Sequence, residues 1–182
     1  MHSIKIQNIV ASTTIAKNLD LESIEKSLPN TNYKPNLFPG LVLRMGEPKT
    51  AFLLFKSGKV VCTGAKTIED VNKAIGKVCN MLKKAGFKVI DNPQVEIQNI
   101  VASADLHGKL NLVNTGFALG LENVEYEPEI FPGMVYRVEE FGVVLLLFGS
   151  GKIVCTGARK AEQVTKAVEK LKKELEERGL LL

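Results

Sequence analysis

Two halves of this chain repeat each other. Ile6–Ser12 (IQNIVAS) recurs without change as Ile97–Ser103, at an offset of 91 residues. Leu54–Lys66 returns as Leu147–Arg159 at an offset of 93, with ten of thirteen residues identical. A period of 91–93 residues is far longer than a solenoid unit, which takes roughly 20–50 residues. The repeat therefore predicts two copies of a small domain related by a pseudo-twofold axis.

Each copy, residues 1–91 and residues 92–182, predicts the same α+β plan. Short β-branched and apolar runs between turn residues are typical of strands, and Lys56–Lys59 is a hairpin signal. In the first copy these strands are predicted at Ile4–Ile15, Leu41–Met45, Thr50–Phe55 and Val60–Thr63. A short helix is predicted to end before Pro29, and a long one to begin after Thr67. Strands joined by hairpins, with two helices, indicate an antiparallel sheet covered on one face.

Apolar residues at helical spacing predict which side of each long helix is buried. These stripes are Ile68, Val71, Ile75, Val78 and Leu82 in the first copy, and Val164, Val168, Leu171 and Leu175 in the second.

Both faces of the predicted sheet are apolar. Side chains two apart on a strand share a face, so Leu53 and Phe55 face one way and Leu54 the other. Antiparallel sheets usually present a polar face to water, and two helices per copy are too few to cover both sides. One apolar face is therefore left for a ligand or for a homodimer interface, and strand parity alone does not decide between them.

Composition excludes several classes of protein. The longest apolar run, Val143–Phe148, is six residues, far short of the roughly 20 that span a bilayer. The first ten residues lack a signal-peptide pattern, and three cysteines without a CxxC pair fit a reducing compartment. We therefore expect an intracellular protein, in the cytoplasm or nucleoid, or in the nucleus if the source is eukaryotic, with no membrane partner.

An enzyme is not expected. The only histidines are His2 and His107, which makes a histidine-based catalytic or metal site hard to build. HExxH, GxGxxG, GxxxxGK[ST] and GxSxG motifs are absent from the sequence. The sequence therefore predicts no catalytic residues, no metal and no cofactor.

The two copies differ in charge. Residues 1–91 hold 14 Lys and Arg against 7 Asp and Glu, a net of +7, whereas residues 92–182 hold 10 against 13, a net of −3. Such an asymmetry favours two partners of opposite charge, one anionic and one basic.

The repeated motifs resemble those of the TATA-binding protein family. The resemblance is carried by two copies of the QNIVAS strand, the FPG-x-V-x-R segment and the LLF-x-SGK-[VI]-VCTGA hairpin, and it spans roughly Ile4 to Leu175. The short stretch before the first strand is more similar to archaeal members. The resemblance implies a saddle, a ten-stranded antiparallel sheet with four helices on its convex face and the DNA minor groove on its concave face. This family is itself a standard example of minor-groove kinking.

Four phenylalanines are implied to be the wedges that open base steps. Phe38 precedes one strand and Phe55 closes the next, so antiparallel pairing would bring the two rings to one edge of the sheet. Phe131 and Phe148 repeat the arrangement. Core packing is the alternative for any single phenylalanine.

Base and groove contacts are implied for the strand residues of the concave face. Asn8 and Asn99 would donate hydrogen bonds to minor-groove acceptors, with Thr63 and Thr156 beside them. An amide donor suits adenine N3 and thymine O2 but meets the amine of guanine, so A·T preference follows. The apolar floor would be Val10, Leu53, Val61, Val101, Leu146 and Val154, for which ordinary strand core is the alternative.

Phosphate contacts are implied along the flanks, where they would fix position and give salt-dependent affinity. They are Arg44, Ser57, Lys59 and Lys66 in the first copy, and Arg137, Ser150, Lys152 and Arg159 in the second.

A protein partner is implied at the second copy's FPG segment. By resemblance, Glu127, Glu129 and Ile130 contact transcription factor B, which recruits RNA polymerase in turn. An acidic loop at one edge would make a nearly symmetric complex directional; a solvated loop is the alternative.

One turn departs from the family pattern. Glu139–Gly142 stands where many members have a Pro-Lys turn. Its two acids would weaken phosphate attraction and Phe141 would be an extra exposed aromatic, but the sequence leaves open whether the turn touches DNA or a partner. A repeated α+β domain that binds a small ligand, or dimerises through its open sheet, is the competing reading of the whole chain.

Overall fold

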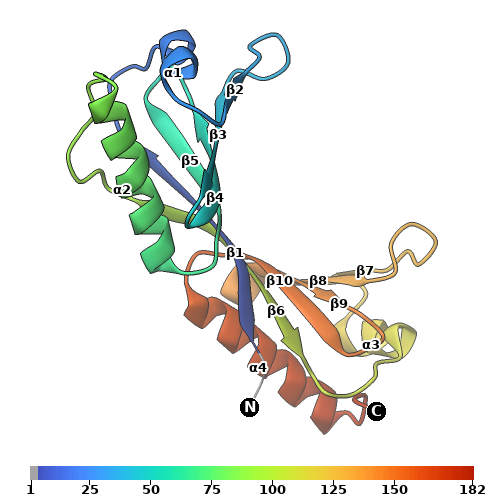
Figure 1. Ribbon diagram of the computed structural model, residues 1–182. Helices are drawn as coiled ribbons and strands as arrows, with labels where there is room; N and C mark the ends of the chain where they lie inside the picture. The colour runs from blue at the N-terminus through green and yellow to red at the C-terminus, as the bar shows by residue number, and fades with distance from the viewer. Residues whose placement is uncertain (1–3) are drawn as a thin grey trace. The chain divides into compact units, whose positions relative to one another are not determined.

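Ten strands and four α-helices form the duplicated α+β fold in the computed structural model, which describes residues 4–182 (Figure 1). The strands make one sheet in the order β2-β3-β4-β5-β1-β6-β10-β9-β8-β7. The antiparallel sheet that the residue pattern predicts and the ten strands that the resemblance implies are confirmed. The chain separates into two compact units. Unit 2 is Asn8–Gln98, and unit 1 is Asn99–Leu182 together with the described residues up to Gln7.

The described residues of the first half of the chain form two helices and five strands. They are β1 (Lys5–Thr14), α1 (Leu21–Ser27), β2 (Thr31–Tyr33), β3 (Leu41–Gly46), β4 (Lys49–Leu54), β5 (Lys59–Ala65) and α2 (Ile68–Lys84). Asp20 caps α1 by accepting a hydrogen bond from the Ser23 N–H, and Thr67 caps α2 through the Asp70 N–H.

The second half repeats this plan and adds a single 3-10 turn. Its elements are β6 (Glu96–Asp105), α3 (Leu112–Leu119), β7 (Val124–Glu125), β8 (Met134–Val138), η1 (Glu139–Phe141), β9 (Val143–Leu147), β10 (Lys152–Ala158) and α4 (Ala161–Glu177). Asn111 caps α3 through the Asn114 N–H. The offset between the repeats changes from 91 to 93 between Asn111 and Asn123. The helix caps Asp20 and Asn111 are 91 residues apart, whereas Asn30 and Asn123, whose carbonyls accept equivalent hydrogen bonds from Arg44 N and Arg137 N, are 93 apart.

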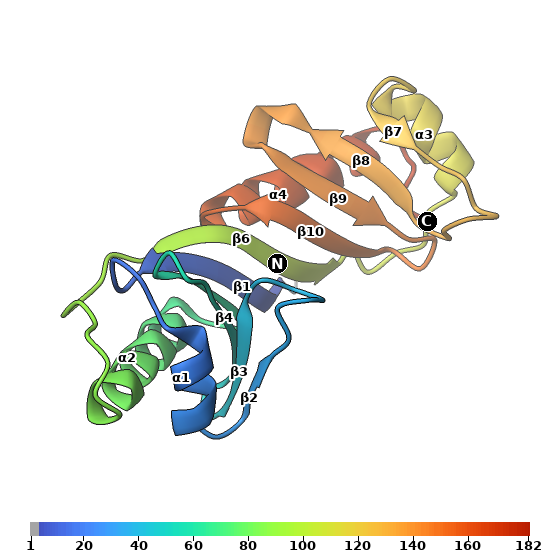
Figure 2. The same cartoon turned by 90° about the horizontal axis from the view of Figure 1, so that it is seen from above.

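Helices cover one sheet face in each unit, and the core lies between them (Figure 2). Ile9, Phe52 and Leu54 are fully buried on that face of unit 2, whereas Leu53, their neighbour on β4, is only half-buried on the other face. Leu145 and Leu147 are buried in the same way in unit 1. The predicted parity of the strands is therefore confirmed, and each unit keeps one face without helices, which we call its open face.

The helix stripes are confirmed except at one residue. All four stripe residues of α4 are buried, and so are Val71, Ile75, Val78 and Leu82 of α2. Ile68, the first residue of the helix, is 48% exposed.

Strand pairing accounts for two short strands that the residue pattern did not predict. β2 pairs with β3, with Tyr33 opposite Leu41, and β7 pairs with β8, with Val124 opposite Tyr136. Two or three residues are too few to show a period-2 pattern, so these edge strands exist only because a neighbour offers free backbone groups.

The β8–β9 turn packs on α4 instead of projecting from the unit. Phe141 is half-buried, its carbonyl accepts a hydrogen bond from Gln163 Nε2 at 2.8 Å, and the Lys170 ammonium lies 5.8 Å from the ring centroid. Lys170 also pairs with Glu140. The expectation of an exposed aromatic is wrong, because α4 supplies both an amide and a cation to the turn. Within residues 4–182, no helix is long and apolar enough to cross a membrane.

Candidate nucleic-acid interface

Cross-strand rows of apolar side chains form the open face of each unit. The registers align Val42 with Leu53 and Leu53 with Val61 in unit 2. They align Val135 with Leu146 and Leu146 with Val154 in unit 1. All six side chains are half-buried. Four of them were expected as an apolar floor, and the register adds Val42 and Val135, which sequence reasoning missed although strand parity points to them.

Val10 and Val101, the other two residues of the expected floor, lie on β1 and β6. Both are half-buried, whereas their neighbours Ile9 and Ile100 are 0% and 2% exposed and belong to the core. Val10 and Val101 therefore point away from the core and lie on the open faces of the two units.

Aromatic pairs lie at the end of each open face. The ring centroids of Phe38 and Phe55 are 6.0 Å apart at an interplanar angle of 65°, and those of Phe131 and Phe148 are 5.8 Å apart at 68°. Both pairs are therefore edge-to-face. Phe38 and Phe131 remain 41% and 40% exposed. The structure brings together the rings that the sequence paired and leaves part of their surface to solvent.

A glycine supports each aromatic pair. A Cβ on Gly40 would lie 2.7 Å from a carbon of the Phe38 ring and 3.0 Å from one of Phe55. On Gly133 it would lie 2.7 Å from Phe131 and 2.9 Å from Phe148. The glycine of each FPG motif therefore leaves the space in which the two rings meet, a role that the sequence alone did not reveal.

Asn8 and Asn99 occupy equivalent positions beside a bulge in each unit. The register of β1 with β5 shifts between Ile9 and Ala11. The backbone of Gly64 then turns its N–H toward the Asn8 side chain, whose Oδ1 accepts it at 2.6 Å. In unit 1 the Gly157 N–H donates to Asn99 Oδ1 at 2.7 Å. Gly64 and Gly157 have φ of +100° and +95°, values that suit glycine.

These backbone donors fix the orientation of both amides. Because a main-chain N–H can be paired only with an acceptor, Oδ1 must face the glycine and Nδ2 must face away. Nδ2 reaches the hydroxyl oxygen of Thr63 at 3.1 Å in unit 2 and that of Thr156 at 3.3 Å in unit 1. An amide NH₂ carries two hydrogens, so each asparagine keeps a second N–H donor. All four side chains are half-buried.

The expected phosphate contacts lie at the margins of the open faces. Arg44 pairs across the sheet with Ala51, and Ala51 with Thr63, which places Arg44 on the open face. Arg137 is the equivalent residue, but its guanidinium lies 3.4 Å from Glu125 Oε1. Within the described part of the chain, Arg137 is the one expected phosphate-binding cation that lies within ion-pair distance of a carboxylate. The other five are Arg44, Lys59, Lys66, Lys152 and Arg159.

The other expected phosphate contacts lie in turns and at strand ends. Ser57 and Ser150 are exposed in the hairpin turns, and their hydroxyls accept the N–H of Lys59 and Lys152 at 3.4 Å. Lys66 and Arg159 follow β5 and β10, directly before the N-terminal caps of α2 and α4.

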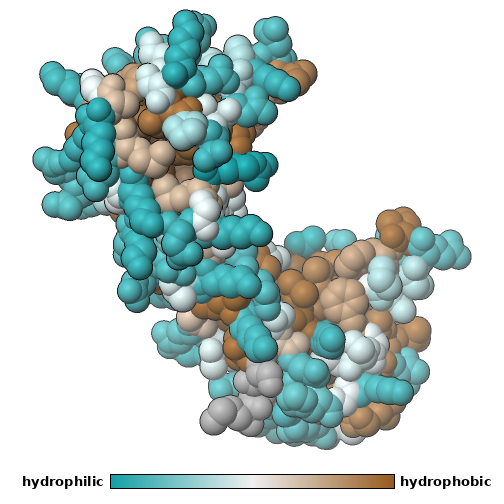
Figure 3. Space-filling view, viewed as in Figure 1, coloured by the Kyte–Doolittle hydropathy of each residue, from teal (hydrophilic) through white to brown (hydrophobic). Residues whose placement is uncertain are grey.

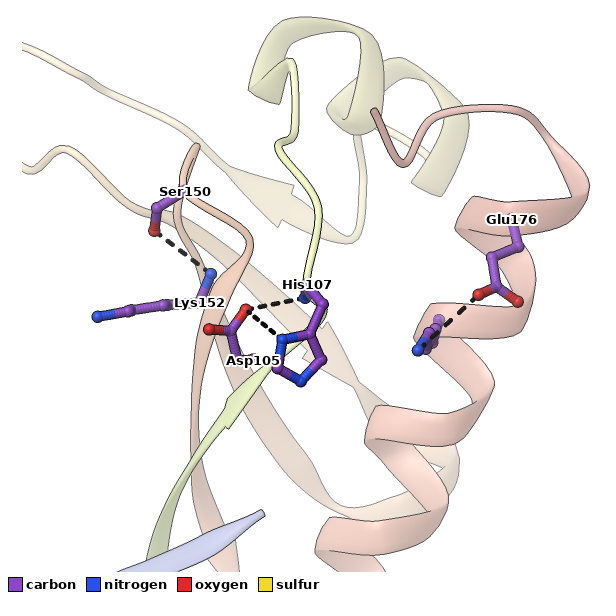
Figure 4. A network of polar contacts seen from close by, with 6 residues as sticks. Asp105, His107, Ser150, Lys152 and Glu176 are labelled. Atoms are coloured by element: carbon purple, nitrogen blue, oxygen red, sulfur yellow. Dashed lines mark hydrogen bonds and ion pairs between the residues drawn. The ribbon is translucent and has the colours of Figure 1, made fainter. Parts of the chain in front are cut away.

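A hollow of about 580 Å³ adjoins Phe148 in unit 1, and Lys5, Ser150 and Lys152 contribute to its lining. Asp105 and His107 also line it: Asp105 Oδ1 accepts the His107 N–H at 2.8 Å and lies 3.9 Å from Nδ1 (Figure 4). Sequence reasoning assigned no role to Lys5, Asp105 or His107. His2 lies outside the described residues, and residues 4–182 contain no group of three His, Cys, Asp or Glu side chains that could hold a metal ion.

The loops before Phe38 and Phe131 have the same backbone but opposite charge. Lys34 O accepts the N–H of Leu37 and Phe38, and Glu127 O accepts the N–H of Ile130 and Phe131. Ile130 is 79% exposed, and it lines a hollow of about 210 Å³ together with Glu127. Glu129 is exposed as well. The space-filling view shows apolar surface at the tip of this loop (Figure 3).

Cys62 and Cys155 belong to the core, as the parity of their strands predicts. They are 0% and 1% exposed, and burial raises the pKa of each thiol to about 11. At neutral pH both are neutral thiols that pack as small apolar side chains.

Each of the two units has an uncovered apolar sheet face with a pair of aromatic rings and an oriented amide, so the chain is a duplicated α+β protein with exposed apolar sheet surface in each repeat. The family model described as "Transcription factor TFIID (or TATA-binding protein, TBP)" matches residues 3–85 and 94–178. The TATA-box-binding protein of Picrophilus torridus is 57% identical over 181 residues, covering 100% of this chain and 98% of the relative. That of Thermoplasma acidophilum is 58% identical over 178 residues, covering 98% and 97%.

A solved structure, Methanococcus jannaschii TBP, matches with a TM-score of 0.88 and 49% identity, covering 96% of this chain and 98% of that one. The chain belongs to the TATA-binding protein family, in its archaeal branch. The resemblance stated from the motifs is confirmed, and so is the expectation that this is a transcription factor and not an enzyme.

Proposed function

We propose that this protein is a general transcription initiation factor that binds the minor groove of an A·T-rich TATA element and kinks the DNA there. The observation that carries the proposal is the pair of oriented amides: Asn8 and Asn99 each have Oδ1 held by a glycine N–H at 2.6 and 2.7 Å. Each of these two amides therefore keeps a free N–H donor, while its oxygen is taken by the glycine N–H. The relatives named above support the choice of a TATA element, since they carry TATA-box binding in their names.

Donors at these positions select A·T pairs. In the minor groove, A·T and T·A pairs both present only acceptors, adenine N3 and thymine O2. A G·C pair adds the N2 amine of guanine, a donor, which would leave two donors facing each other. Unpaired buried donors are costly, so the amides favour A·T pairs while distinguishing A·T from T·A poorly.

The paired phenylalanines act as wedges at the ends of the site. Insertion of an apolar side chain unstacks a base step, at a cost of about a few kcal/mol, and contacts between the bent duplex and the protein offset that cost. Phe38 and Phe131, which are 41% and 40% exposed, have surface available for this. The half-buried valines and leucines between the pairs would pack against sugars and base edges.

The flanking cations supply affinity that depends on salt. Arg44, Lys59, Lys66, Lys152 and Arg159 have no carboxylate within 4 Å among the residues described, so each is able to pair with a phosphate. Each phosphate neutralised releases counterions and steepens the fall of affinity with ionic strength. Arg137 is an exception, because Glu125 competes for its guanidinium.

The first experiment is a binding and end-to-end FRET titration on a short duplex carrying a TATA-like element, repeated across a salt series. A G·C-substituted duplex of equal length is the control, and sedimentation determines whether the free protein is a monomer or a dimer. We expect selective, salt-sensitive binding with a shortened end-to-end distance. Equal binding to both duplexes without bending would overturn the proposal, and a stable dimer closed through the open faces would favour the competing reading.

We further propose that the loop Glu127–Ile130 binds transcription factor B, and through it RNA polymerase. The equivalent positions in unit 2 are Lys34, Asn36 and Leu37 on the same backbone. A basic partner surface would therefore choose the unit 1 loop over the unit 2 loop, which gives direction to a nearly symmetric complex.

An exchange of loop charges tests this. Glu127→Lys with Glu129→Asn should reduce transcription factor B binding to the protein–DNA complex at least tenfold while leaving DNA binding unchanged. The matched control is Lys34→Glu with Asn36→Glu in the unit 2 loop. This variant keeps the acidic loop of unit 1 and should bind transcription factor B as the wild type does. Retention of binding by the first variant would show that the acidic loop is a solvated surface.

A further inference from the structure

An apolar stripe on α3 has no counterpart on α1, the equivalent helix of unit 2. Val113 is 55% exposed, Phe117 is 66% exposed and Leu121, just past the end of the helix, is 62% exposed. Their spacing is i, i+4, i+8, so Val113 and Phe117 lie one turn apart on the same side of α3. Figure 3 shows apolar surface in the region of α3.

The helix caps align the two helices and show what the stripe replaces. Asp20 caps α1 and Asn111 caps α3, so Val113 corresponds to Glu22 and Phe117 to Lys26. Both residues of α1 are exposed and charged. Since the same local fold is stable with a charged surface, the apolar residues of α3 are not required by the fold.

The segment of chain that carries the stripe is acidic. Between Leu110 and Phe131 the charged residues are Glu122, Glu125, Glu127 and Glu129, with no Lys or Arg. Glu122 directly follows Leu121, and Glu125 is partly neutralised by Arg137. The nearest cation in sequence is Lys109, which precedes the helix cap.

The size and charge of this surface select its occupant. Three side chains of this kind expose at most a few hundred Å², less than half of the roughly 800 Å² that one partner buries in a standard protein–protein interface. A second copy placed symmetrically would also bring two acidic rims together, and DNA phosphates would be repelled. A single amphipathic helix, anchored by apolar residues at i, i+3, i+4 and i+7, fits a stripe of these dimensions.

We infer that the Val113–Phe117–Leu121 surface binds an amphipathic helix of a partner protein whose apolar face is flanked by Lys or Arg. The surface is separate from the open face that we propose for DNA and from the loop Glu127–Ile130. Unit 1 would thus carry a docking site that unit 2 lacks.

The test uses the full-length chain and two synthetic helical peptides. Both have leucine at i, i+3, i+4 and i+7; one has lysine at the flanking positions and the other has glutamate. Binding is followed by fluorescence anisotropy and mapped by amide chemical shifts. We expect the lysine peptide to bind at least tenfold more tightly than the glutamate peptide, with shifts centred on α3.

Val113→Glu with Phe117→Lys gives α3 the surface residues of α1 and adds an i, i+4 pair that supports the helix. We expect this variant to lose at least tenfold in affinity for the lysine peptide while it binds the TATA-like duplex as the wild type does. The matched control is Glu22→Ala with Lys26→Ala on α1, which should change neither. Equal binding of both peptides, shifts away from α3, or a concentration-dependent dimer abolished by the double variant would each overturn the inference.

Discussion

The open faces of the two units are nearly identical, whereas their helix-bearing faces are not. The ring centroids are 6.0 and 5.8 Å apart in the two aromatic pairs, and the glycine N–H lies 2.6 and 2.7 Å from the asparagine oxygen. On the other side, α1 is charged where α3 is apolar. A ligand with two equivalent halves requires open faces that are alike. Protein partners that bind only one unit require helix-bearing faces that differ.

The long helices differ in how their charges are paired. On α4, Lys166 pairs with Glu162 and Arg178 with Glu174, and Lys172 and Lys173 each lie 3.9 Å from a glutamate one turn later. On α2, Lys83 pairs with Asp91 and Lys77 donates to the Glu47 carbonyl. The cations of α4 named here are therefore paired within their own helix or its cap, whereas these two cations of α2 are paired with residues outside theirs.

Replacing an open-face amide should give the largest effect. In Asn99→Asp the carboxylate can still accept the Gly157 N–H, now 2.7 Å from Asn99 Oδ1, so the bulge should persist. The N–H donor is lost and a negative charge faces the groove acceptors. Loss of a base contact costs about 1–3 kcal/mol, so we expect an affinity loss of about 100-fold on a TATA-like duplex, measured by anisotropy at fixed salt.

Asn8→Asp is the matched variant in unit 2. If the two open faces contribute alike, its loss should agree with that of Asn99→Asp within a few fold. A tenfold difference between the variants would break the equivalence, and an unchanged affinity in both would remove the amides from the site.

Removing one wedge should reduce bending more than stability. Phe148→Ala deletes a half-buried ring whose partner is Phe131. An aromatic pair adds about 0.5–1.5 kcal/mol beyond burial, so the fold should survive while the FRET-measured bend decreases and affinity falls about tenfold. Phe55→Ala should do the same at the other end. Unfolding by several kcal/mol with bending intact would assign Phe148 to the core.

Adding a methyl group beneath the rings should have a smaller effect. In Gly133→Ala the new Cβ would lie 2.7 Å from the Phe131 ring and 2.9 Å from that of Phe148. The contacted atoms are the far ends of side chains at an edge, so the rings should swing apart at a cost of about 1 kcal/mol. Urea unfolding measures that cost and FRET measures the accompanying loss of bend.

Gly76→Ala is the control for the glycine substitution. Gly76 lies inside α2 with nothing within 4 Å of a new Cβ, so alanine should stabilise the protein by about 0.5–1 kcal/mol. A Gly133→Ala protein as stable and as effective in bending as the wild type would show that the glycine does not support the rings.

The sequence predicted the helices and all strands except β2 and β7, because the repeat doubled each pattern and the strand parity was clear. Leu53 and Leu54 differ in burial as their positions require, and the two aromatic pairs meet because antiparallel neighbours bring Phe38 to Phe55 and Phe131 to Phe148. These features depend on local periodicity and nearest-neighbour pairing, which a sequence displays directly.

Other features depend on contacts between residues far apart in the chain. The orientation of the Asn8 amide is set by the N–H of Gly64, 56 residues away in the chain. The bulge that brings the two together is not predicted by any local sequence pattern. The β8–β9 turn is held by Gln163 and Lys170 of α4, so Phe141 packs where its sequence context suggested exposure. The exposed stripe of α3 became visible only when the helix caps aligned it with α1.

The ion pair between the β8–β9 turn and α4 should have the smallest effect of the changes considered. The hydrogen bond to Glu140 raises the pKa of Lys170 above its usual value, so the contribution of the pair is complete at neutral pH and is lost only as pH rises through that raised pKa. Both side chains are about half exposed, 47% and 58%, and such pairs contribute about 0–1 kcal/mol.

We therefore expect Glu140→Gln to lower the free energy of unfolding by less than about 0.5 kcal/mol, with a difference from wild type that is constant between pH 6 and 9 and shrinks with added salt. Urea denaturation at low and high salt measures it. Glu177→Gln, which removes a looser pair at 3.9 Å, is the control and should change less still. A loss above 2 kcal/mol would mean that the turn depends on this pair to stay on α4, and the packing of Phe141 and the hydrogen bond from Gln163 would then be secondary to it.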